Sequence, residues 1–145
     1  MELVPVYEHM EENPKLATDP LLAESLSMSI DFYKRVGFVP PWICYYVKKN
    51  EDLVGCAGIK GKPVNGTIEI AYGTFEKFRN QGIATEICKI LVDLSIHTDP
   101  TIRITARTLP ENNFSTKILA KNGFINIGPV IDPEDGELWE WEYQK

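Results

Sequence analysis

The 145-residue sequence is poor in the residue types that build metal sites and disulfide frameworks. It has three cysteines and two histidines, with no Cys-x-x-Cys pair and no cluster of Cys and His. Cys44, Cys56 and Cys88 are odd in number and widely spaced, which favours buried thiols in a reducing compartment. We therefore expect no metal site and a cytoplasmic location.

Long apolar runs and an excess of positive charge are also missing. No run approaches the roughly 18 residues of a membrane-spanning helix, and the first residues lack the pattern of a secretory signal. Lysine and arginine total 15 against 21 aspartates and glutamates, a net charge of −6. Nucleic-acid binding requires a basic surface, so we expect neither a nucleic-acid nor a membrane partner. An acidic surface instead suits a cationic or amine substrate.

The chain does have the composition and periodicity of a globular domain, with 43% hydrophobic and 25% charged residues. No repeat, low-complexity tract or linker divides it, so we expect a single domain over residues 1–145. Periodicity predicts the order helix, three strands, helix, strand, helix and two strands. The first helix is expected from Asp19-Pro20 to Val36, with Gly37 ending it. Strands are expected at 42–48, 53–60, 67–74, 102–108, from 124, and 138–143, with a short one near 3–7.

The stretch with the most chemical information joins the strand at 67–74 to a helix. The polar loop from Arg79 to Gly82 leads into apolar residues at helical spacing, namely Ile83, Ile87, Ile90, Leu91 and Leu94. Unpaired N–H groups and the positive end of the helix dipole at such a helix start favour a phosphate or pyrophosphate. Neither a Walker loop nor a Gly-x-Gly-x-x-Gly fingerprint is present.

Glu69 interrupts this otherwise apolar strand. Strand alternation places Glu69 on one face with Ala71 and Gly73, and opposite to Ile68, Ile70 and Tyr72. A carboxylate among small residues indicates the floor of a cleft, where it can act as a general base. The alternative is an edge residue that faces solvent. Gly55 and Gly58 in the preceding strand predict a close approach of backbone or ligand.

Two segments resemble signatures of the GNAT superfamily of acyl-CoA-dependent N-acyltransferases. The run Arg79-Asn-Gln-Gly-Ile-Ala84 is similar to the family's pyrophosphate loop, Arg/Gln-x-x-Gly-x-Gly/Ala. The segment from Glu69 to Tyr72 lies where the family has its bulged acyl-CoA strand. The resemblance covers roughly residue 42 to the end.

The second signature is the run Pro110-Glu-Asn-Asn-Phe-Ser115, followed by a helix and Gly123-Phe124. Its spacing is most similar to the branch that acetylates N-terminal amines of ribosomal proteins. Asn112 is expected to cap the helix and also to contact the pantetheine arm. The inner face of this helix is expected to be Phe114, Ile118 and Leu119, with Lys117 and Lys121 as solvated charges on its outer face.

The resemblance implies an α+β (α/β) fold with a mixed, mostly antiparallel central sheet of six to seven strands, flanked by helices. It implies an N-acetyltransferase that moves an acetyl group from acetyl-CoA to a primary amine, by direct attack in a ternary complex. The acceptor is a small molecule or a peptide N-terminus. A non-catalytic acyl-CoA-binding or sensing module is the alternative. The identity of the amine, the length of the acyl group and the oligomeric state, including a homodimer, stay open.

The resemblance also implies the site residues. Glu69 is the expected base, and Ser115 the group that helps to protonate the leaving thiolate. Many relatives carry a tyrosine acid where this chain has Leu119, so the proton comes from Ser115, from water, or from Tyr45 or Tyr72. The residues expected to bind acetyl-CoA are Tyr72, Gly73, Thr74, Phe75, Arg79, Asn80, Gln81, Gly82, Ile83, Ala84, Thr85, Asn112 and Ser115.

Overall fold

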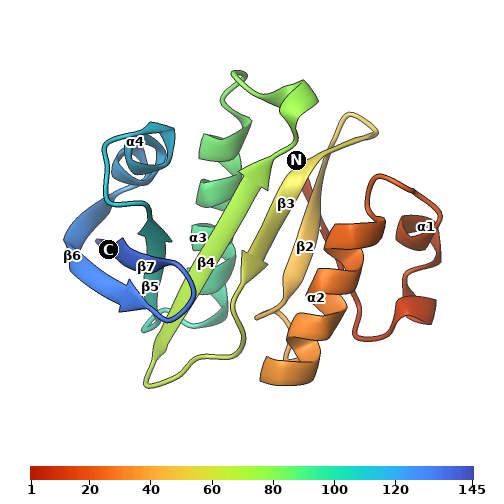
Figure 1. Ribbon diagram of the computed structural model, residues 1–145, viewed down its shortest axis with the longest axis horizontal. Coiled ribbons are helices and arrows are strands. Elements are labelled where there is room, and N and C mark those ends of the chain that lie inside the picture. Colours follow the sequence, from red (N-terminus) through yellow and green to blue (C-terminus); the bar gives the residue numbers. More distant parts are fainter.

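Seven strands form one sheet in the order β1-β2-β3-β4-β5-β7-β6 in the computed structural model, which describes residues 1–145 (Figure 1). Every neighbouring pair is antiparallel except β4 and β5, which run parallel. The predicted mixed, mostly antiparallel sheet is therefore confirmed. The strands are β1 (Glu2–Pro5), β2 (Cys44–Lys49), β3 (Asp52–Ile59), β4 (Thr67–Thr74), β5 (Arg103–Thr108), β6 (Phe124–Asp132) and β7 (Gly136–Tyr143).

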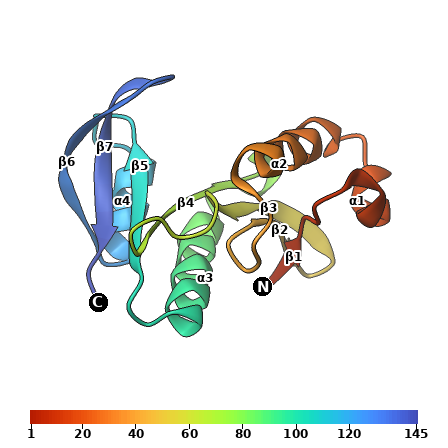
Figure 2. The ribbon, with the colours of Figure 1, turned by 90° about the horizontal axis from the view of Figure 1, so that it is seen from below.

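The helices cover both faces of the sheet, with α2 on one side of β2 and β3 and α3 on the other (Figure 2). They are η1 (Met10–Glu12), α1 (Pro14–Ala17), α2 (Ala23–Val36), η2 (Glu76–Phe78), α3 (Ile83–Thr98) and α4 (Phe114–Lys121). The short helices before α2 were not predicted. None of the helices has both the length and the apolar character that a membrane span needs.

The buried residues of α2 are Leu26, Ile30 and Tyr33, and they join the core together with Leu22, which directly precedes the helix. The predicted start of this helix is wrong by several residues, because α2 begins at Ala23. The Asp19 carboxylate accepts the Leu21 N–H at 2.9 Å and so stabilises a turn before the helix. The Asp-Pro pair therefore initiates a turn, and Gly37 ends the helix with φ of 92° as predicted.

The parallel pair β4–β5 separates after three residues. Its register covers only Thr67 to Glu69 opposite Arg103 to Thr105, and the two strands then diverge (Figure 1). The Thr105 hydroxyl donates to the Ile68 carbonyl at 2.8 Å beside the last paired residues. Beyond this point β4 stays paired with β3 as far as Thr74, so its other edge has no strand partner.

The two glycines of β3 behave differently. A Cβ on Gly55 would lie 2.3 Å from the Gly73 carbonyl oxygen, so only glycine lets β4 pass at this distance. A Cβ on Gly58 would meet its nearest atom, the Cys44 Sγ, at an ordinary 3.8 Å. The predicted close approach is therefore confirmed at Gly55, whereas at Gly58 no protein atom comes unusually close.

The cap of α4 is Asn113 and not Asn112, which corrects the prediction. The Asn113 side chain accepts the Thr116 N–H at 3.1 Å, and the Thr116 hydroxyl accepts the Asn113 N–H at 3.0 Å. This reciprocal pair starts the helix one residue later than expected. As a result the buried face is Thr116 and Leu119, while Phe114, predicted to be buried, is 76% exposed.

Candidate active site

A cleft of about 1030 Å³ opens where β4 leaves β5, between the N-terminal ends of α3 and α4. We call it the β4–α3 cleft. The predicted site residues that line it are Tyr72, Gly73, Thr74, Arg79, Asn80, Gly82, Ile83, Ala84, Thr85 and Ser115. Gln81 is exposed outside the lining, as is Asn112, which therefore lies away from the site predicted for it.

The start of α3 presents unpaired backbone donors to this cleft. Asn80 and Gly82 have φ of 65° and 74°, and this left-handed turn leads directly into the helix. The first helical bond runs from the Glu86 N–H to the Gly82 carbonyl at 3.3 Å. The preceding amides, from Gly82 to Thr85, consequently have no partner within the helix and form a site for an anion.

The free edge of β4 forms the wall opposite these amides. The Lys60 N–H donates to the Glu69 carbonyl at 2.9 Å, and the Phe75 N–H donates to the Val54 carbonyl at 2.9 Å. Because backbone groups alternate along a strand, the odd-numbered residues between them face β3. The N–H groups of Tyr72 and Thr74 therefore face the gap, whereas the Gly73 N–H faces β3.

Two residues next to this edge differ in their access to the cleft. Thr74 lines the cleft, but its hydroxyl oxygen is buried and has no hydrogen-bond partner. Phe75 was predicted to bind the cosubstrate, but it lies outside the lining. Its ring packs near Tyr46, with the ring centroids 6.4 Å apart, because β4 ends and turns inward there.

Sequence reasoning missed one wall of the cleft. It is formed by α4 and η2 through Phe78, Phe114, Lys117, Ile118, Ala120 and Lys121. Lys117 and Lys121 were predicted as solvated charges on the outer face of the helix. They are exposed, but they lie on the cleft side of α4, whose buried residues are Thr116 and Leu119. The spacing of Phe114, Ile118 and Lys121 along one side of a helix was the available signal.

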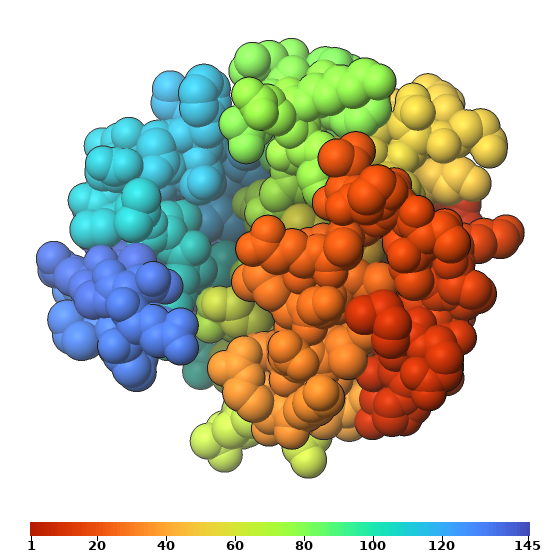
Figure 3. All heavy atoms as spheres, turned by 45° about the vertical axis from the view of Figure 1, so that its right-hand side comes forward, coloured from red at the N-terminus to blue at the C-terminus, as the bar shows by residue number.

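A second, smaller cleft of about 430 Å³ lies beside the first, and we call it the Glu69 cleft. It shares Tyr72 and Ser115 with the β4–α3 cleft. Its other lining residues are Lys60, Glu69, Ile70, Ala71, Ala106, Arg107, Thr108, Leu109, Leu119, Asp132, Asp135 and Leu138. Figure 3 shows a hollow between the orange α2 and the blue β6–β7 hairpin, with yellow-green atoms of the central strand at its floor. The two clefts therefore meet at one pair of residues.

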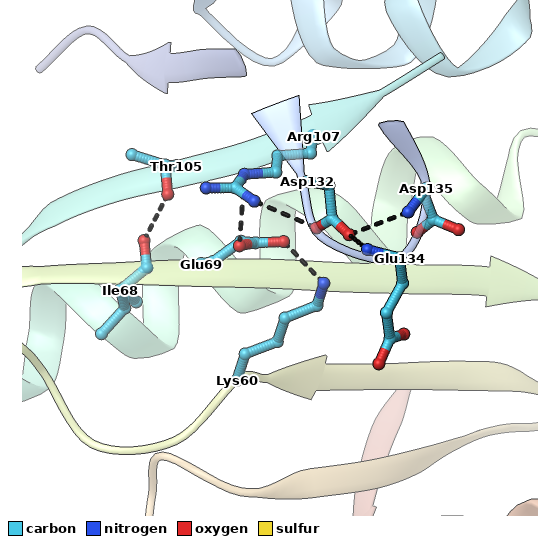
Figure 4. A network of polar contacts seen from close by, with 8 residues as sticks. All are labelled: Lys60, Ile68, Glu69, Thr105, Arg107, Asp132, Glu134 and Asp135. Carbon is cyan, nitrogen blue, oxygen red and sulfur yellow. Dashed lines mark hydrogen bonds and ion pairs between the residues drawn. The ribbon is translucent and has the colours of Figure 1, made fainter. Parts of the chain in front are cut away.

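Glu69 is the centre of an ionic network in the second cleft (Figure 4). Its side chain is 20% exposed, so it is not the solvent-facing edge residue of the alternative interpretation. The Lys60 Nζ lies 2.7 Å from one carboxylate oxygen, and the Arg107 Nε lies 3.7 Å from the other. The sequence predicted the partial burial of Glu69 on a cleft but not these two cations. Its role as a base stays a prediction.

Asp132 ties this network to the β6–β7 hairpin. Its carboxylate accepts the backbone N–H groups of Asp135 and Glu134 at 3.0 and 2.8 Å, and the Arg107 Nη1 lies 3.2 Å away. The two backbone hydrogen bonds, with Arg107 and Lys60 nearby, hold the pKa of Asp132 below its usual range. Asp132 is therefore a charged anchor that fixes the position of Arg107.

The comparison with known families agrees with this geometry. Residues 7–125 match the acetyltransferase (GNAT) domain family. The chain belongs to the GNAT acetyltransferase family. The resemblance of the two signatures, at the helix start of α3 and along α4, is thereby confirmed.

One curated relative is YjdG of Bacillus subtilis (strain 168), described as an uncharacterized N-acetyltransferase. It is 34% identical over 97 residues, which are 66% of this chain and 55% of the relative. The chain thus spans about half the length of that protein. The match supports membership of the family, but it covers only 55% of that relative and gives no information about the acceptor.

Three solved structures share the fold. A spermidine N-acetyltransferase chimera of Vibrio cholerae SpeG and hSSAT has a TM-score of 0.70 at 13% identity, covering 99% of this chain and 95% of its own. RimL, a ribosomal alpha-N-protein acetyltransferase in complex with coenzyme A, has a TM-score of 0.66 at 18%, covering 90% and 76%. The aminoglycoside acetyltransferase AAC(6')-Ib in complex with coenzyme A has a TM-score of 0.61 at 21%, covering 71% and 66%.

Of the side chains predicted to protonate the thiolate, Ser115 is the one whose hydroxyl is exposed beside both clefts. The Tyr45 hydroxyl donates to the Pro41 carbonyl at 2.7 Å, outside both clefts, and burial raises its pKa to about 12. Burial also raises the pKa of Tyr72, whose hydroxyl contacts Cys88 on α3. Leu119, at the position of the usual tyrosine, is buried and 1% exposed.

The cysteines are poorly suited to a covalent route. Burial raises the pKa of the Cys44 thiol, and so disfavours the thiolate that such a route needs. Cys56 is exposed and not buried as predicted, and neither Cys44 nor Cys56 lines a cleft. No group of three or more His, Cys, Asp or Glu side chains is placed to hold a metal ion. Glu69, Ser115 and the start of α3 line the two clefts, and their parts in acyl transfer stay predictions.

Proposed function

We propose that this protein is an acetyl-CoA-dependent N-acetyltransferase that acetylates a primary amine by direct attack in a ternary complex. The acceptor is a small molecule or a peptide N-terminus. The observation that carries the proposal is that the two clefts meet at Tyr72 and Ser115. One cleft offers an anion site at the start of α3, and the other offers a carboxylate and space for an amine.

The β4–α3 cleft fits the parts of acetyl-CoA in order. The pyrophosphate accepts hydrogen bonds from the amides at Gly82 to Thr85, and Arg79 adds a charged donor at the rim. The pantetheine amides pair with the free edge of β4 as an added strand does, at Tyr72 and Thr74.

The chemistry follows from where the clefts meet. The Tyr72 N–H, which faces the gap, polarises the thioester carbonyl and stabilises the developing oxyanion. Glu69 takes a proton from the acceptor ammonium, directly or through water, and the free amine attacks the carbonyl carbon. The C–S bond breaks, the nitrogen loses its second proton to solvent, and Ser115 donates a proton to the thiolate and regains one from solvent. Because a free thiol has a pKa of about 8.5, assistance by a hydroxyl accelerates this step without being essential to it.

A non-catalytic acyl-CoA-binding module is the second candidate. Leu119 provides no hydroxyl at the usual acid position, and both oxygens of Glu69 already face a cation. Such a module keeps the anion site at α3 and does not turn over. Only activity separates the two candidates.

The deciding experiment measures release of free CoA thiol from acetyl-CoA over a panel of primary amines, with CoA binding measured by calorimetry in parallel. We expect binding together with turnover of at least one amine. Binding without turnover across the panel identifies the module instead. A cytoplasmic location is part of the proposal. So is acetyl as the preferred acyl group, which is tested by comparing acetyl-CoA with longer acyl-CoA thioesters.

A matched pair of glycine variants tests the anion site. Gly82 and Gly66 have φ of 74° and 71°, and a Cβ would meet no atom within 4 Å at either position. Alanine at each therefore imposes a similar backbone cost of about 1 kcal/mol. Only Gly82→Ala adds a methyl group where the pyrophosphate binds, so it should weaken CoA binding about tenfold, or about 1.4 kcal/mol. Equal CoA affinity in the two variants would remove this assignment.

A further inference from the structure

Lys60 places a primary amine inside the Glu69 cleft. It directly follows β3, and its backbone N–H donates to the Glu69 carbonyl, so the two residues are neighbours across the strands. Its Nζ lies 2.7 Å from the Glu69 carboxylate. The Lys60 amine is therefore ion-paired with the proposed base, and so lies next to the group that would take its proton.

The Lys60 side chain also extends in the direction that an acceptor amine needs. Figure 4 shows Lys60 reaching across to β4, with its Nζ lying past the Glu69 carboxylate in the direction in which β4 runs. Along that direction the strand reaches Tyr72, where the two clefts meet. Lys60, Tyr72 and Ser115 all line the one cleft.

The two cations around Glu69 are not held equally. Arg107 is fixed from a second side by Asp132, at 3.2 Å. Lys60 has its ion pair with Glu69 alone, and its side chain is 49% exposed. Lys60 is therefore the partner that can leave the carboxylate and extend toward the thioester.

We propose that Lys60 is an internal acceptor, which the protein acetylates on Nζ with its own acetyl-CoA when no external amine occupies the Glu69 cleft. This inference rests on the proposed function, because it uses the same thioester and the same base. The Lys60 ammonium gives one proton to Glu69, and the Nζ lone pair attacks the thioester carbonyl carbon. The C–S bond breaks, the nitrogen gives its second proton to the thiolate through water, and the products are Nε-acetyl-Lys60 and free CoA.

Two physical consequences follow. An amine carried on the same chain needs no diffusional encounter, so it reacts at a high effective concentration. Once acetylated, Lys60 is neutral, and Glu69 loses its nearest cation while the acetyl group fills part of the cleft. External amines should therefore protect Lys60, and modification of Lys60 should change turnover of external amines.

The test follows acetyl occupancy by peptide mass spectrometry after incubation of the intact protein with acetyl-CoA and no amine. Lys62 is the matched control, because it lies two residues further along, is exposed, and lines neither cleft. We expect initial labelling of Lys60 to exceed that of Lys62 by about tenfold or more. The specific rate should be independent of protein concentration, as an intramolecular step requires. Glu69→Gln should reduce the labelling of Lys60 to the level of Lys62.

Equal labelling of Lys60 and Lys62, or a Lys60 rate that heat denaturation or Glu69→Gln leaves unchanged, overturns the inference. Failure of this inference can be distinguished from failure of the proposed function. Turnover of an external amine without excess labelling of Lys60 rejects the internal acceptor and keeps the enzyme. Binding of CoA with neither turnover nor labelling rejects the proposed function itself. Circular dichroism of Glu69→Gln checks that loss of labelling is not loss of folding.

Discussion

The two clefts that meet at Tyr72 and Ser115 are built from different parts of the chain. The β4–α3 cleft depends mainly on backbone groups: the amides at the start of α3, the left-handed turn at Gly82 and the unpaired edge of β4. These lie within one continuous segment of the sequence. The Glu69 cleft depends on side chains from separate elements, with Glu69 on β4, Arg107 on β5 and Asp132 at the end of β6.

The difference shows how a family can keep its cosubstrate while acceptors vary. A backbone amide tolerates many side chains at its position, so an anion site at a helix start survives substitution. An ion-pair network changes with each charge that is replaced. Here Glu69 faces two cations and Asp132 holds one of them, so a substitution at any of these positions would change the charge of the cleft. We propose that the acceptor is selected on this side of the site.

Replacing the central charge of the Glu69 cleft should have the largest effect. Glu69→Gln keeps the shape and removes the base, and kcat/KM for an amine should fall about 10²-fold or more. Glu142→Gln is the matched control, since Glu142 is also 20% exposed and also paired with an arginine, Arg103, but lines neither cleft. Steady-state kinetics should show the loss only for Glu69. A similar loss in both variants would indicate a general effect of breaking an ion pair.

The β4–α3 cleft can be disturbed through β3, which pairs with β4. Gly55→Ala places a Cβ 2.3 Å from the Gly73 carbonyl oxygen, so β4 must shift. We expect the free energy of unfolding to fall by about 2 kcal/mol, together with weaker CoA binding. Gly58→Ala meets only ordinary contacts and should change stability by less than about 0.5 kcal/mol. Urea denaturation of both variants measures the difference, and equal stabilities would show that the β3–β4 spacing is adaptable.

The junction of the clefts is tested at Ser115. Ser115→Ala should lower kcat about tenfold and leave KM for acetyl-CoA nearly unchanged, because the proton is donated late in the reaction. Ser115→Thr keeps the hydroxyl and should retain most of the activity. Ser27→Ala, at an exposed position on α2, controls for the loss of a surface hydroxyl. Full activity in Ser115→Ala would assign protonation to water.

The smallest effect is expected at Arg79, on the rim of the β4–α3 cleft. Arg79→Ala removes one exposed charge and should raise the Kd for CoA by roughly threefold at low salt. The difference from the wild type should shrink as salt rises, because exposed charges are screened. Arg35→Ala, at an exposed position on α2, is the control. An effect larger than that of Gly82→Ala would mean that the side chain outweighs the backbone amides.

Much of the fold was predictable because its signals are local. The strand at Thr67–Thr74 matches the predicted range, and α3 and β5 begin within one residue of theirs. The anion site was predictable for the same reason, since the turn at Gly82 and the helix after it are consecutive in the chain. The start of α2 and the cap of α4 were wrong, because an Asp or Asn can serve either a turn or a helix start.

The sequence by itself determined the element order and the turn and helix start that leave free amides at α3, which depend on short-range rules of turn chemistry and periodicity. The family was indicated by the resemblance of the two signatures. Only the tertiary structure decided which charges surround Glu69 and which face of α4 forms the cleft wall. Lys60, Arg107 and Asp132 are far apart in sequence, and they meet because β4 separates from β5 and the β6–β7 hairpin closes beside that gap. Contacts of this kind leave no periodic signal, since they are set by packing and not by the chain's local conformation.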